Sequence, residues 1–325
     1  ITPGGAINGE VTVPGDKSKL HRSVMLGSLA VGETKISGFL PGEDCLATMR
    51  AFRDMGVVIE QAAPTQLVIQ GVGLHGLKEP SAPLNLGNSG TSMRLVTGIL
   101  SAQPFSSVLT GDESLSKRPM ARVTEPLAEM GAKITDNAGC PPLHIHGNQP
   151  LKGITYEMPI ASAQIKSCLL LAGLYAEGQT TVIEPSRSRD HTELMLETFG
   201  YSVARKGASI SVNGGGHLTA TDLTVPGDIS SAAFFIVAAA IVPGSDLLIR
   251  NVGVNPTRTG IINILSMMGA KIKIENEHFV GSEPVADIHV QYAPLQGISI
   301  PIEQVPLAID EFPILFIAAA VAQGQ

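Results

Sequence analysis

The 325-residue sequence contains no tryptophan, only 4% aromatic residues and only 16% charged residues. With 44% hydrophobic residues, it still has the composition of an ordinary folded protein and not of a disordered tail. Because aromatic residues are scarce and there are 35 glycines, we expect many tight turns and a core of Ala, Ile, Leu, Val and Met. The length favours about two domains.

Positive charge is also in deficit, because the formal net charge is −7 and the isoelectric point is about 5.6. An acidic balance argues against a general affinity for nucleic acid or for anionic membranes. If the protein binds an anionic ligand, a local cluster of positive groups must hold that ligand.

Cysteines and long apolar runs are scarce as well. The three cysteines (Cys45, Cys140 and Cys168) form no C-x-x-C pair, so we interpret them as reduced packing residues of a cytoplasmic protein. A reactive thiol is the alternative. The longest apolar run, Ala232 to Val242, is too short to span a bilayer, and no signal-peptide pattern opens the chain.

A repeat of about 70 residues runs through the sequence. Four amphipathic helix patterns end at Gly56, Gly131, Gly200 and Gly269, which lie 75, 69 and 69 residues apart. Glycine just after the last turn is a typical helix stop. The pattern Thr257 to Met268 is the fourth of these helices, and a short alternating strand follows each stop.

Each repeat also contains a second helix, which is apolar almost all round. Such a helix is expected to be buried on every face. The sequence therefore predicts an α/β or α+β fold with buried parallel helices at the centre and sheets outside them. The clearest apolar helix patterns are Ile165 to Ala176, Ser231 to Val242 and Phe312 to Ala322.

The turns before these helices carry groups suited to anions. A helix N-terminus presents unpaired N–H groups and partial positive charge, so it binds phosphate or carboxylate well. Residues 14–22 bring Lys17, Ser18 and Arg22 to one such start, and Gly90 lets a ligand approach the backbone at another. A capped helix with a solvated basic start, or a plain turn, is the alternative.

Two further segments point to the same chemistry. Arg118 precedes a proline in a polar loop, where a guanidinium could bind carboxylate or phosphate or could form a surface salt bridge. Ser162 can cap the apolar helix that follows it, but capping does not explain Gln164 and Lys166 as readily.

Two charged segments remain ambiguous on the residues alone. Arg189 lies in the run 187–193, which could be only a helix start. Asp310 leads into the last apolar helix, where it is either an N-cap or a general base that faces cations.

Together, these segments resemble the EPSP synthase (3-phosphoshikimate 1-carboxyvinyltransferase) family, in the order typical of that family. The similarity extends over nearly the whole chain. The similarity rests on residues 14–18 with Arg22, 87–91 with Arg94, 118–120, 162–164, 189–193, 227–232 and 310–311.

The resemblance implies a two-domain enolpyruvyl transferase-like fold with three βαβαβ-type repeats in each domain. One domain should comprise residues 14–224, and the other residues 1–13 plus 225–325. The repeat count then predicts that about one and a half repeats, or ~100 residues, follow Gln325. The family's later Lys-Glu-Ser-Asp-Arg motif has no counterpart in the sequence, so we expect this chain to be inactive alone.

The implied reaction uses phosphoenolpyruvate and shikimate 3-phosphate, with no metal and no cofactor, in a cytoplasmic monomer. Asp310 and Lys17 resemble the catalytic residues. Gly90 also leaves room for the inhibitor glyphosate, although Leu95 stands where many sensitive members have proline. By similarity, phosphoenolpyruvate is bound by Lys17, Gly90, Arg118 and Gln164. By similarity, shikimate 3-phosphate is bound by Lys17, Ser18, Arg22, Ser162, Ala163, Gln164, Arg189 and Asp310.

Three other functions remain open on the sequence. A UDP-N-acetylglucosamine enolpyruvyl transferase usually carries a cysteine before the Arg-Pro pair and Lys-Asn in place of Lys17-Ser18, whereas residues 111–118 contain no cysteine. A non-catalytic anion-binding repeat protein is the second alternative. A nucleic-acid enzyme built on related repeats is the third, and the acidic isoelectric point argues against it.

Overall fold

The computed structural model describes residues 4–324 and divides the chain into two compact units. The large unit comprises Lys17–Leu223, and the small unit comprises the residues up to Asp16 together with those from Thr224 onward. The sequence places the domain boundaries at 14 and 225, a few residues from these divisions.

The large unit contains three copies of one β-α-β-α-β-β repeat, the first of which lacks its opening strand. The first copy comprises α1 (Lys17–Leu29), β2 (Ala30–Ser37), α2 (Glu43–Asp54), β3 (Val58–Ala63) and β4 (Gln66–Val72). The second comprises β5 (Leu84–Asn85), α3 (Gly90–Leu100), β6 (Ser107–Thr110), the short 3-10 helix η1 (Leu115–Lys117), α4 (Ala121–Glu129), β7 (Lys133–Asn137) and β8 (Cys140–His146). The third comprises β9 (Thr155–Glu157), α5 (Ala163–Gly173), β10 (Gln179–Ile183), α6 (His191–Thr198), β11 (Ala204–Lys206) and β12 (Ser209–Asn213).

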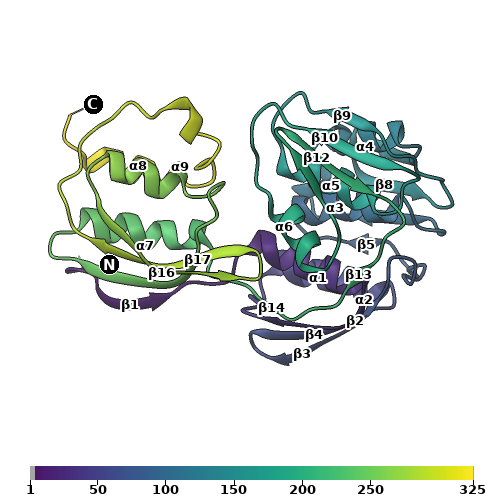
Figure 1. The fold of residues 1–325 in the computed structure, drawn as a ribbon, viewed down its shortest axis with the longest axis horizontal. Coiled ribbons are helices and arrows are strands. Elements are labelled where there is room, and N and C mark those ends of the chain that lie inside the picture. Colours follow the sequence, from purple (N-terminus) through teal and green to yellow (C-terminus); the bar gives the residue numbers. More distant parts are fainter. Residues whose placement is uncertain (1–3, 325) are drawn as a thin grey trace. The chain divides into compact units, whose positions relative to one another are not determined.

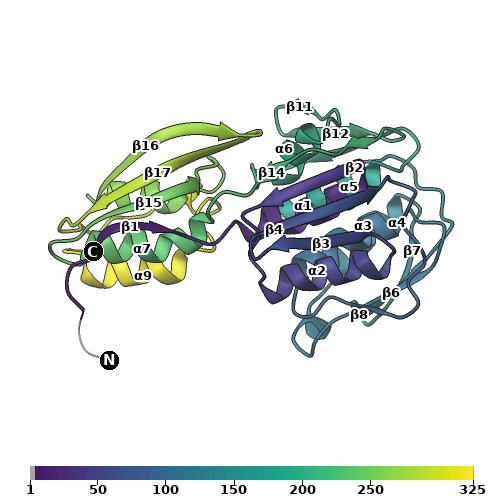
Figure 2. The same cartoon turned by 90° about the horizontal axis from the view of Figure 1, so that it is seen from below.

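Each copy in the large unit forms its own mixed sheet, and the apolar helices lie inside the sheets (Figures 1 and 2). The strand orders are β5-β6-β8-β7, β11-β12-β10-β9 and β13-β2-β4-β3, in which β13 is Leu218–Thr219. The predicted architecture of central helices and outer sheets is confirmed. The glycine stops are confirmed too, because Gly56, Gly131 and Gly200 have φ of 88°, 102° and 78°, where a side chain would be strained.

The small unit contains one complete repeat and a further helix. Its sheet has the order β1-β15-β17-β16. The elements are β1 (Asn8–Thr12), α7 (Ile229–Ile241), β15 (Asp246–Gly253), α8 (Gly260–Met267), β16 (Lys271–Val280), β17 (Glu283–Gln291), the 3-10 helix η2 (Ile302–Gln304) and α9 (Phe312–Val321). The short strand β14 (Leu223–Thr224) begins at the last residue of the large unit and pairs with β2.

Two strands pair far from their own chain neighbours. β1 immediately precedes α1 in sequence, yet it lies parallel to β15 of the small unit, with Asn8 opposite Asp246. β13 immediately precedes the small unit, yet it lies parallel to β2, with Leu218 opposite Ala30. One sheet in each unit is therefore completed by a strand from a distant part of the chain.

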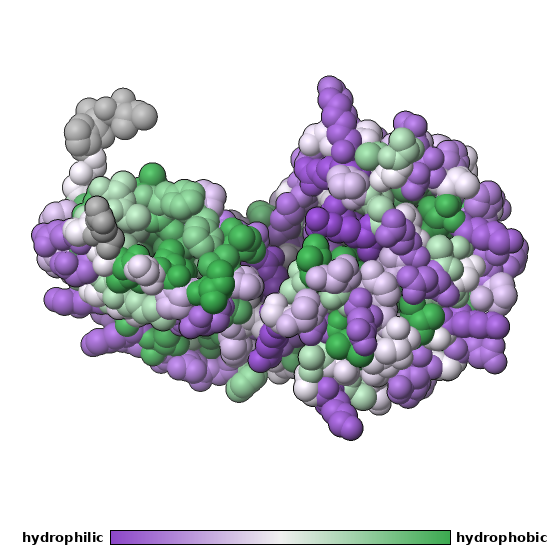
Figure 3. All heavy atoms as spheres, turned by 90° about the horizontal axis from the view of Figure 1, so that it is seen from above, coloured by the Kyte–Doolittle hydropathy of each residue, from purple (hydrophilic) through white to green (hydrophobic). Residues whose placement is uncertain are grey.

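The prediction that the apolar helices are buried on every face is correct for α5 but wrong for α7 and α9. In α7 the side chains of Phe234 and Phe235 are 58% and 40% exposed, and in α9 Phe316 is 64% exposed. In the large unit, α3 packs against both α1 and α5, whereas in the small unit α7 packs against α9 and both helices keep an exposed apolar face. Figure 3 shows apolar side chains gathered on the surface of the small unit.

The apolar helices α5, α7 and α9 contain 11, 13 and 10 residues. Among residues 4–324, no helix combines the length and the apolar character needed to cross a bilayer.

Candidate functional site

The first turns of three helices of the large unit meet at one end of the helix bundle. His21 Nδ1 of α1 lies 3.1 Å from Ser92 Oγ of α3. Arg94 of α3 donates to Gln164 Oε1 of α5 at 2.7 Å. Arg22 of α1 donates to Ser167 Oγ of α5 at 2.8 Å. Because each contact joins residues near a helix start, the three N-termini share one side of the unit.

Two of these N-termini are capped by neutral hydroxyls. Ser89 Oγ accepts from the Ser92 N–H at 3.2 Å, and Ser162 Oγ accepts from the Ile165 N–H at 3.4 Å. A hydroxyl satisfies one N–H but carries no formal charge, so the partial positive charge of the helix end is not neutralised. Ser162 therefore has the capping role that the sequence left open, and this end of the bundle favours an anion.

Gly90, the first residue of α3, lies against two guanidinium groups. A Cβ atom built on Gly90 would lie 3.0 Å from Arg118 Nη1 and 3.2 Å from Arg94 Nη1. Burial lowers the pKa of Arg94, and the nearby Arg122 and Arg118 lower it further. Among residues 4–324, no carboxylate forms an ion pair with Arg94 or Arg118, so positive charge is concentrated at the start of α3, against the buried backbone of Gly90.

The polar neighbours of this pair fix its geometry. Arg118 Nη2 donates to Asn88 Oδ1 at 2.8 Å. The Gln164 amide accepts from Arg94 and donates to Thr91 Oγ1 at 3.1 Å. Gln164, which capping did not explain, therefore joins α5 to α3 within the site. The structure brings Gly90, Arg118 and Gln164 together, and it adds Arg94.

The predicted residues on α1 lie in different environments. Lys17 at the start of the helix is 55% exposed and forms an ion pair with Asp44 of α2. Arg22 is only 4% exposed, and its Nη1 donates to the carbonyl of Ser18 at 2.8 Å. Lys17 is thus accessible to a ligand in solution, whereas Arg22 is a buried residue with a fixed orientation.

The remaining predicted site residues, Ala163, Arg189 and Asp310, lie in three different parts of the structure. Ala163 is the first residue of α5, next to Ser162. Arg189 is half-buried in the loop between β10 and α6. Asp310 is exposed, lies directly before the Glu311 N-cap of α9, and belongs to the small unit.

The small unit has a buried polar centre that the sequence did not reveal. Arg258, 3% exposed, donates to Asp16 Oδ2 and Asp228 Oδ1, both at 3.2 Å, and to Ser230 Oγ at 2.6 Å. Glu311 accepts from Ser230 Oγ at 2.5 Å. The pattern Thr257 to Met268 placed Arg258 inside a helix, but α8 begins at Gly260, which leaves Arg258 free to turn inward. Carboxylates of this chain thus occupy the N-termini of α7 and α9, unlike those of α3 and α5.

Replacing Asp228 by Asn should remove a loss of stability that develops as the pH rises. Burial, and then the Asp16 carboxylate, raise the pKa of Asp228 from 3.8 to about 6. Between these values the folded protein holds a proton that the unfolded chain has lost, so the free energy of unfolding falls with rising pH and levels off above about pH 6. The shift corresponds to at most roughly 3 kcal/mol.

Urea titrations across this pH range should show Asp228→Asn gaining stability relative to the unsubstituted protein as the pH rises. Asp246 provides a control of opposite sign, because a hydrogen bond from His289 lowers the pKa of this exposed carboxyl. Asp246→Asn should therefore lose relative stability as the pH rises toward 3.8, and its relative stability should stay constant across the higher range in which Asp228→Asn changes. A difference for Asp228→Asn that stays constant with pH would contradict the assignment.

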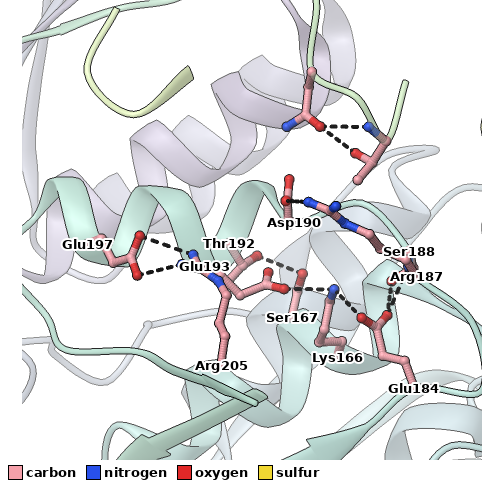
Figure 4. A network of polar contacts seen from close by, with 12 residues as sticks. Lys166, Ser167, Glu184, Arg187, Ser188, Asp190, Thr192, Glu193, Glu197 and Arg205 are labelled. Atoms are coloured by element: carbon pink, nitrogen blue, oxygen red, sulfur yellow. Dashed lines mark hydrogen bonds and ion pairs between the residues drawn. The ribbon is translucent and has the colours of Figure 1, made fainter. Parts of the chain in front are cut away.

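A second buried ionic network surrounds Lys166 of α5, and the sequence drew attention only to Lys166 itself. Lys166 Nζ, 1% exposed, lies 2.9 Å from Glu184 Oε2 and 2.7 Å from Glu193 Oε1 (Figure 4). These three side chains line a cavity of about 480 Å³ beside the loop 185–190. Lys166 was noted as unexplained at a helix start, but its partners are 18 and 27 residues away and no local pattern identifies them.

The comparisons with known proteins agree with this geometry. The family model described as EPSP synthase (3-phosphoshikimate 1-carboxyvinyltransferase) matches residues 1–325. A Methylococcus capsulatus protein of that name is 64% identical over 324 residues, which are 99% of this chain and 74% of the relative. A Legionella pneumophila protein of the same name is 59% identical over 323 residues, which are 99% of this chain and 75% of the relative.

Solved structures give the same result. EPSP synthase from Acinetobacter baumannii superposes with a TM-score of 0.93 at 59% identity, covering 100% of this chain and 74% of the other. The enolpyruvyl transferase NikO from Streptomyces tendae has a TM-score of 0.77 at 16% identity, covering 100% of this chain and 75% of the other, which supports the fold alone. This chain belongs to the EPSP synthase family.

Proposed function

We propose that the natural protein carrying this sequence transfers the enolpyruvyl group of phosphoenolpyruvate to the 5-hydroxyl of shikimate 3-phosphate and releases phosphate. Its relatives at 59–64% identity carry the name of that reaction. The observation that carries the proposal is the pairing of Arg94 and Arg118 beside Gly90 at the α3 N-terminus. Both substrates are anions, and this is a site built for an anion.

Phosphoenolpyruvate is assigned to the end of the bundle formed by α3 and α5. Its phosphate and carboxylate require several donors, and a guanidinium can bind either group in a bidentate manner. Arg118 supplies a guanidinium without an ion-pair partner in residues 4–324, Gly90 places no side chain between the α3 backbone and the two guanidinium groups, and Gln164 supplies an amide. Lys17 adds an exposed ammonium group, which pairs with Asp44 in this structure.

Shikimate 3-phosphate is assigned to the neighbouring starts of α1 and α5. The α5 start combines the Ser162 cap with a helix N-terminus, which suits a phosphate. Arg22 provides a guanidinium whose orientation is fixed by hydrogen bonds to Thr192 and Ser167. The complete set of proposed ligands is Lys17, Ser18, Arg22, Ser162, Ala163, Gln164, Arg189 and Asp310.

The proposed chemistry begins with proton transfer. Asp310 accepts the proton of the 5-hydroxyl while the hydroxyl oxygen bonds to C2 of phosphoenolpyruvate. In the same step C3 takes a proton from a general acid, and the base so formed takes a proton back from C3 when the intermediate collapses. The tetrahedral intermediate then breaks the bond from C2 to the phosphate oxygen and loses a proton from C3, which restores the enol ether. Lys17 and Arg118 stabilise the charge that develops on the phosphate.

The identity of the acceptor substrate tests the proposed reaction most directly. Phosphate release by the natural protein carrying this sequence is measured with phosphoenolpyruvate and either shikimate 3-phosphate or UDP-N-acetylglucosamine. We expect release with shikimate 3-phosphate and none with the nucleotide sugar. Release with the nucleotide sugar alone would establish the other transferase, and release with neither acceptor would refute both.

Replacing Gly90 by Ala should weaken phosphoenolpyruvate binding about tenfold. The new methyl group would lie 3.0 Å from Arg118 Nη1 and 3.2 Å from Arg94 Nη1, so the guanidinium groups must shift away from the ligand. The KM for phosphoenolpyruvate and inhibition by glyphosate report this shift. The matched control is Gly42→Ala, because a Cβ atom at Gly42 would have no neighbour within 4 Å. An unchanged KM in Gly90→Ala would place the ligand elsewhere.

We also propose that the protein acts as a monomer in the cytoplasm. Support for the compartment is limited to the three cysteines, which are free thiols, and support for the monomer comes from the family resemblance. Light scattering on the purified natural protein tests the monomer, and a mass that doubles at micromolar concentration would contradict it.

A further inference from the structure

Two hydroxyl groups hold the guanidinium of Arg22 inside the large unit. Arg22 Nε donates to Thr192 Oγ1 at 2.6 Å, and Nη2 donates to Ser167 Oγ at 2.8 Å. The two hydroxyls are bonded to each other, because Thr192 Oγ1 donates to Ser167 Oγ at 2.6 Å. Thr192 and Ser167 are each 1% exposed, so water does not replace these contacts.

This arrangement fixes the direction of the planar group. Nε and Nη2 form one edge of the guanidinium, and both donate to hydroxyls of the pair, while Nη1 donates to the Ser18 carbonyl. Contacts on both sides leave no freedom to rotate the plane. A planar fork binds an oxyanion well only when its plane is directed at the anion.

The two helices that carry the hydroxyls are locked in register beside them. Lys166 and Ser167 are consecutive on α5, and Thr192 and Glu193 are consecutive on α6. Ser167 bonds to Thr192 at 2.6 Å, and Lys166 pairs with Glu193 at 2.7 Å, as Figure 4 shows. A slip of α6 along α5 would break both contacts together, so the hydroxyl pair has a fixed position.

We propose that Ser167 and Thr192 are positioning residues for the sugar-phosphate acceptor, which act by orienting Arg22. This inference rests on the proposed function, in which Arg22 binds shikimate 3-phosphate. Neither hydroxyl touches the acceptor itself. Their contribution is to hold the guanidinium in one orientation before the ligand arrives, which reduces the loss of side-chain freedom on binding.

The test measures the Kd of shikimate 3-phosphate by calorimetry in the natural protein carrying this sequence. Thr192→Val removes the hydroxyl and keeps the shape of the side chain, so we expect a Kd raised about tenfold. Thr192→Ser keeps the hydroxyl and should restore the Kd to within about twofold. Thr198→Val is the control, because it removes the same hydroxyl from α6 at a position where that hydroxyl donates to the Leu194 carbonyl of the same helix.

A double-mutant cycle separates positioning from a purely structural role. If Thr192 acts through Arg22, Thr192→Val should not weaken binding further in an Arg22→Ala background. Equal weakening in both backgrounds, or an unchanged Kd in Thr192→Val, would overturn the inference. Ser167→Ala repeats the test should Thr192→Val fail to fold. If the unsubstituted protein does not bind shikimate 3-phosphate, the proposed function fails first.

Discussion

Replacing Arg118 by Ala should lower kcat/KM for phosphoenolpyruvate on the order of 1,000-fold in the natural protein carrying this sequence. Arg118 lies beside Gly90 together with Arg94, and no carboxylate in residues 4–324 forms an ion pair with either arginine. Asp112 lies near enough to be affected by the charge of Arg118, but this carboxylate forms no direct ion pair with Arg118, so the guanidinium is available for the transferred phosphate. Losing one guanidinium removes both binding and stabilisation of the leaving group.

The matched control is Lys117→Ala on the preceding residue. Lys117 is 71% exposed and pairs with Glu113 on the surface, so its loss should change kcat/KM less than about twofold. Arg118→Lys should lie between the two, because an ammonium keeps the charge but not the bidentate geometry. If Arg118→Ala and Lys117→Ala behave alike in steady-state kinetics, Arg118 is only a surface residue.

Replacing Lys166 by Met should destabilise the large unit by about 3–5 kcal/mol. Lys166 is the shared partner of two buried carboxylates, Glu184 and Glu193. Burial already raises the pKa of Glu193 despite the attraction of Lys166. Without the ammonium group, Glu193 must either stay charged in an apolar environment or take up a proton, and both lower the free energy of unfolding.

Urea denaturation measures this loss, and a compensating variant tests its cause. Adding Glu184→Gln and Glu193→Gln to Lys166→Met removes the unpaired charges, so it should recover most of the lost stability. Lys152→Met is an ordinary surface control. If the triple variant is as unstable as Lys166→Met alone, lost packing and not unpaired charge accounts for the effect.

Local patterns in the sequence were sufficient to predict the repeat and the layers of the fold. The glycines at 56, 131, 200 and 269 mark helix ends because their positive φ values strongly favour glycine. The near-continuous apolar residues of α5 indicate a helix enclosed by others. Both signals depend on residues that are close together in the chain.

Long-range features could not be predicted in this way. The pairing of β1 with β15, and of β13 with β2, joins strands that are more than 180 residues apart. The same apolar pattern is enclosed in α5 but leaves Phe234 and Phe316 exposed in α7 and α9. An apolar helix pattern shows what a helix can bury and not which neighbours surround it.

Local patterns in the sequence likewise predicted some residues of the two polar sites and missed others. Gly90, Arg118 and Gln164 stood out because each lies in a distinctive turn or helix start. Arg258, Ser167 and Thr192 did not, because a buried arginine and two helix hydroxyls are recognised only from the partners that surround them. The partners of Arg258 include Asp16, 242 residues away.

A crystal structure of the natural protein carrying this sequence, with shikimate 3-phosphate and glyphosate bound, tests the central claim most directly. We expect the two ligands at the shared N-terminal side of α1, α3 and α5, with an anionic group bonded to the Arg118 guanidinium and the sugar phosphate near Arg22 and Ser162. Ligands bound away from those helix starts, with Arg118 still bonded only to Asn88, would contradict it.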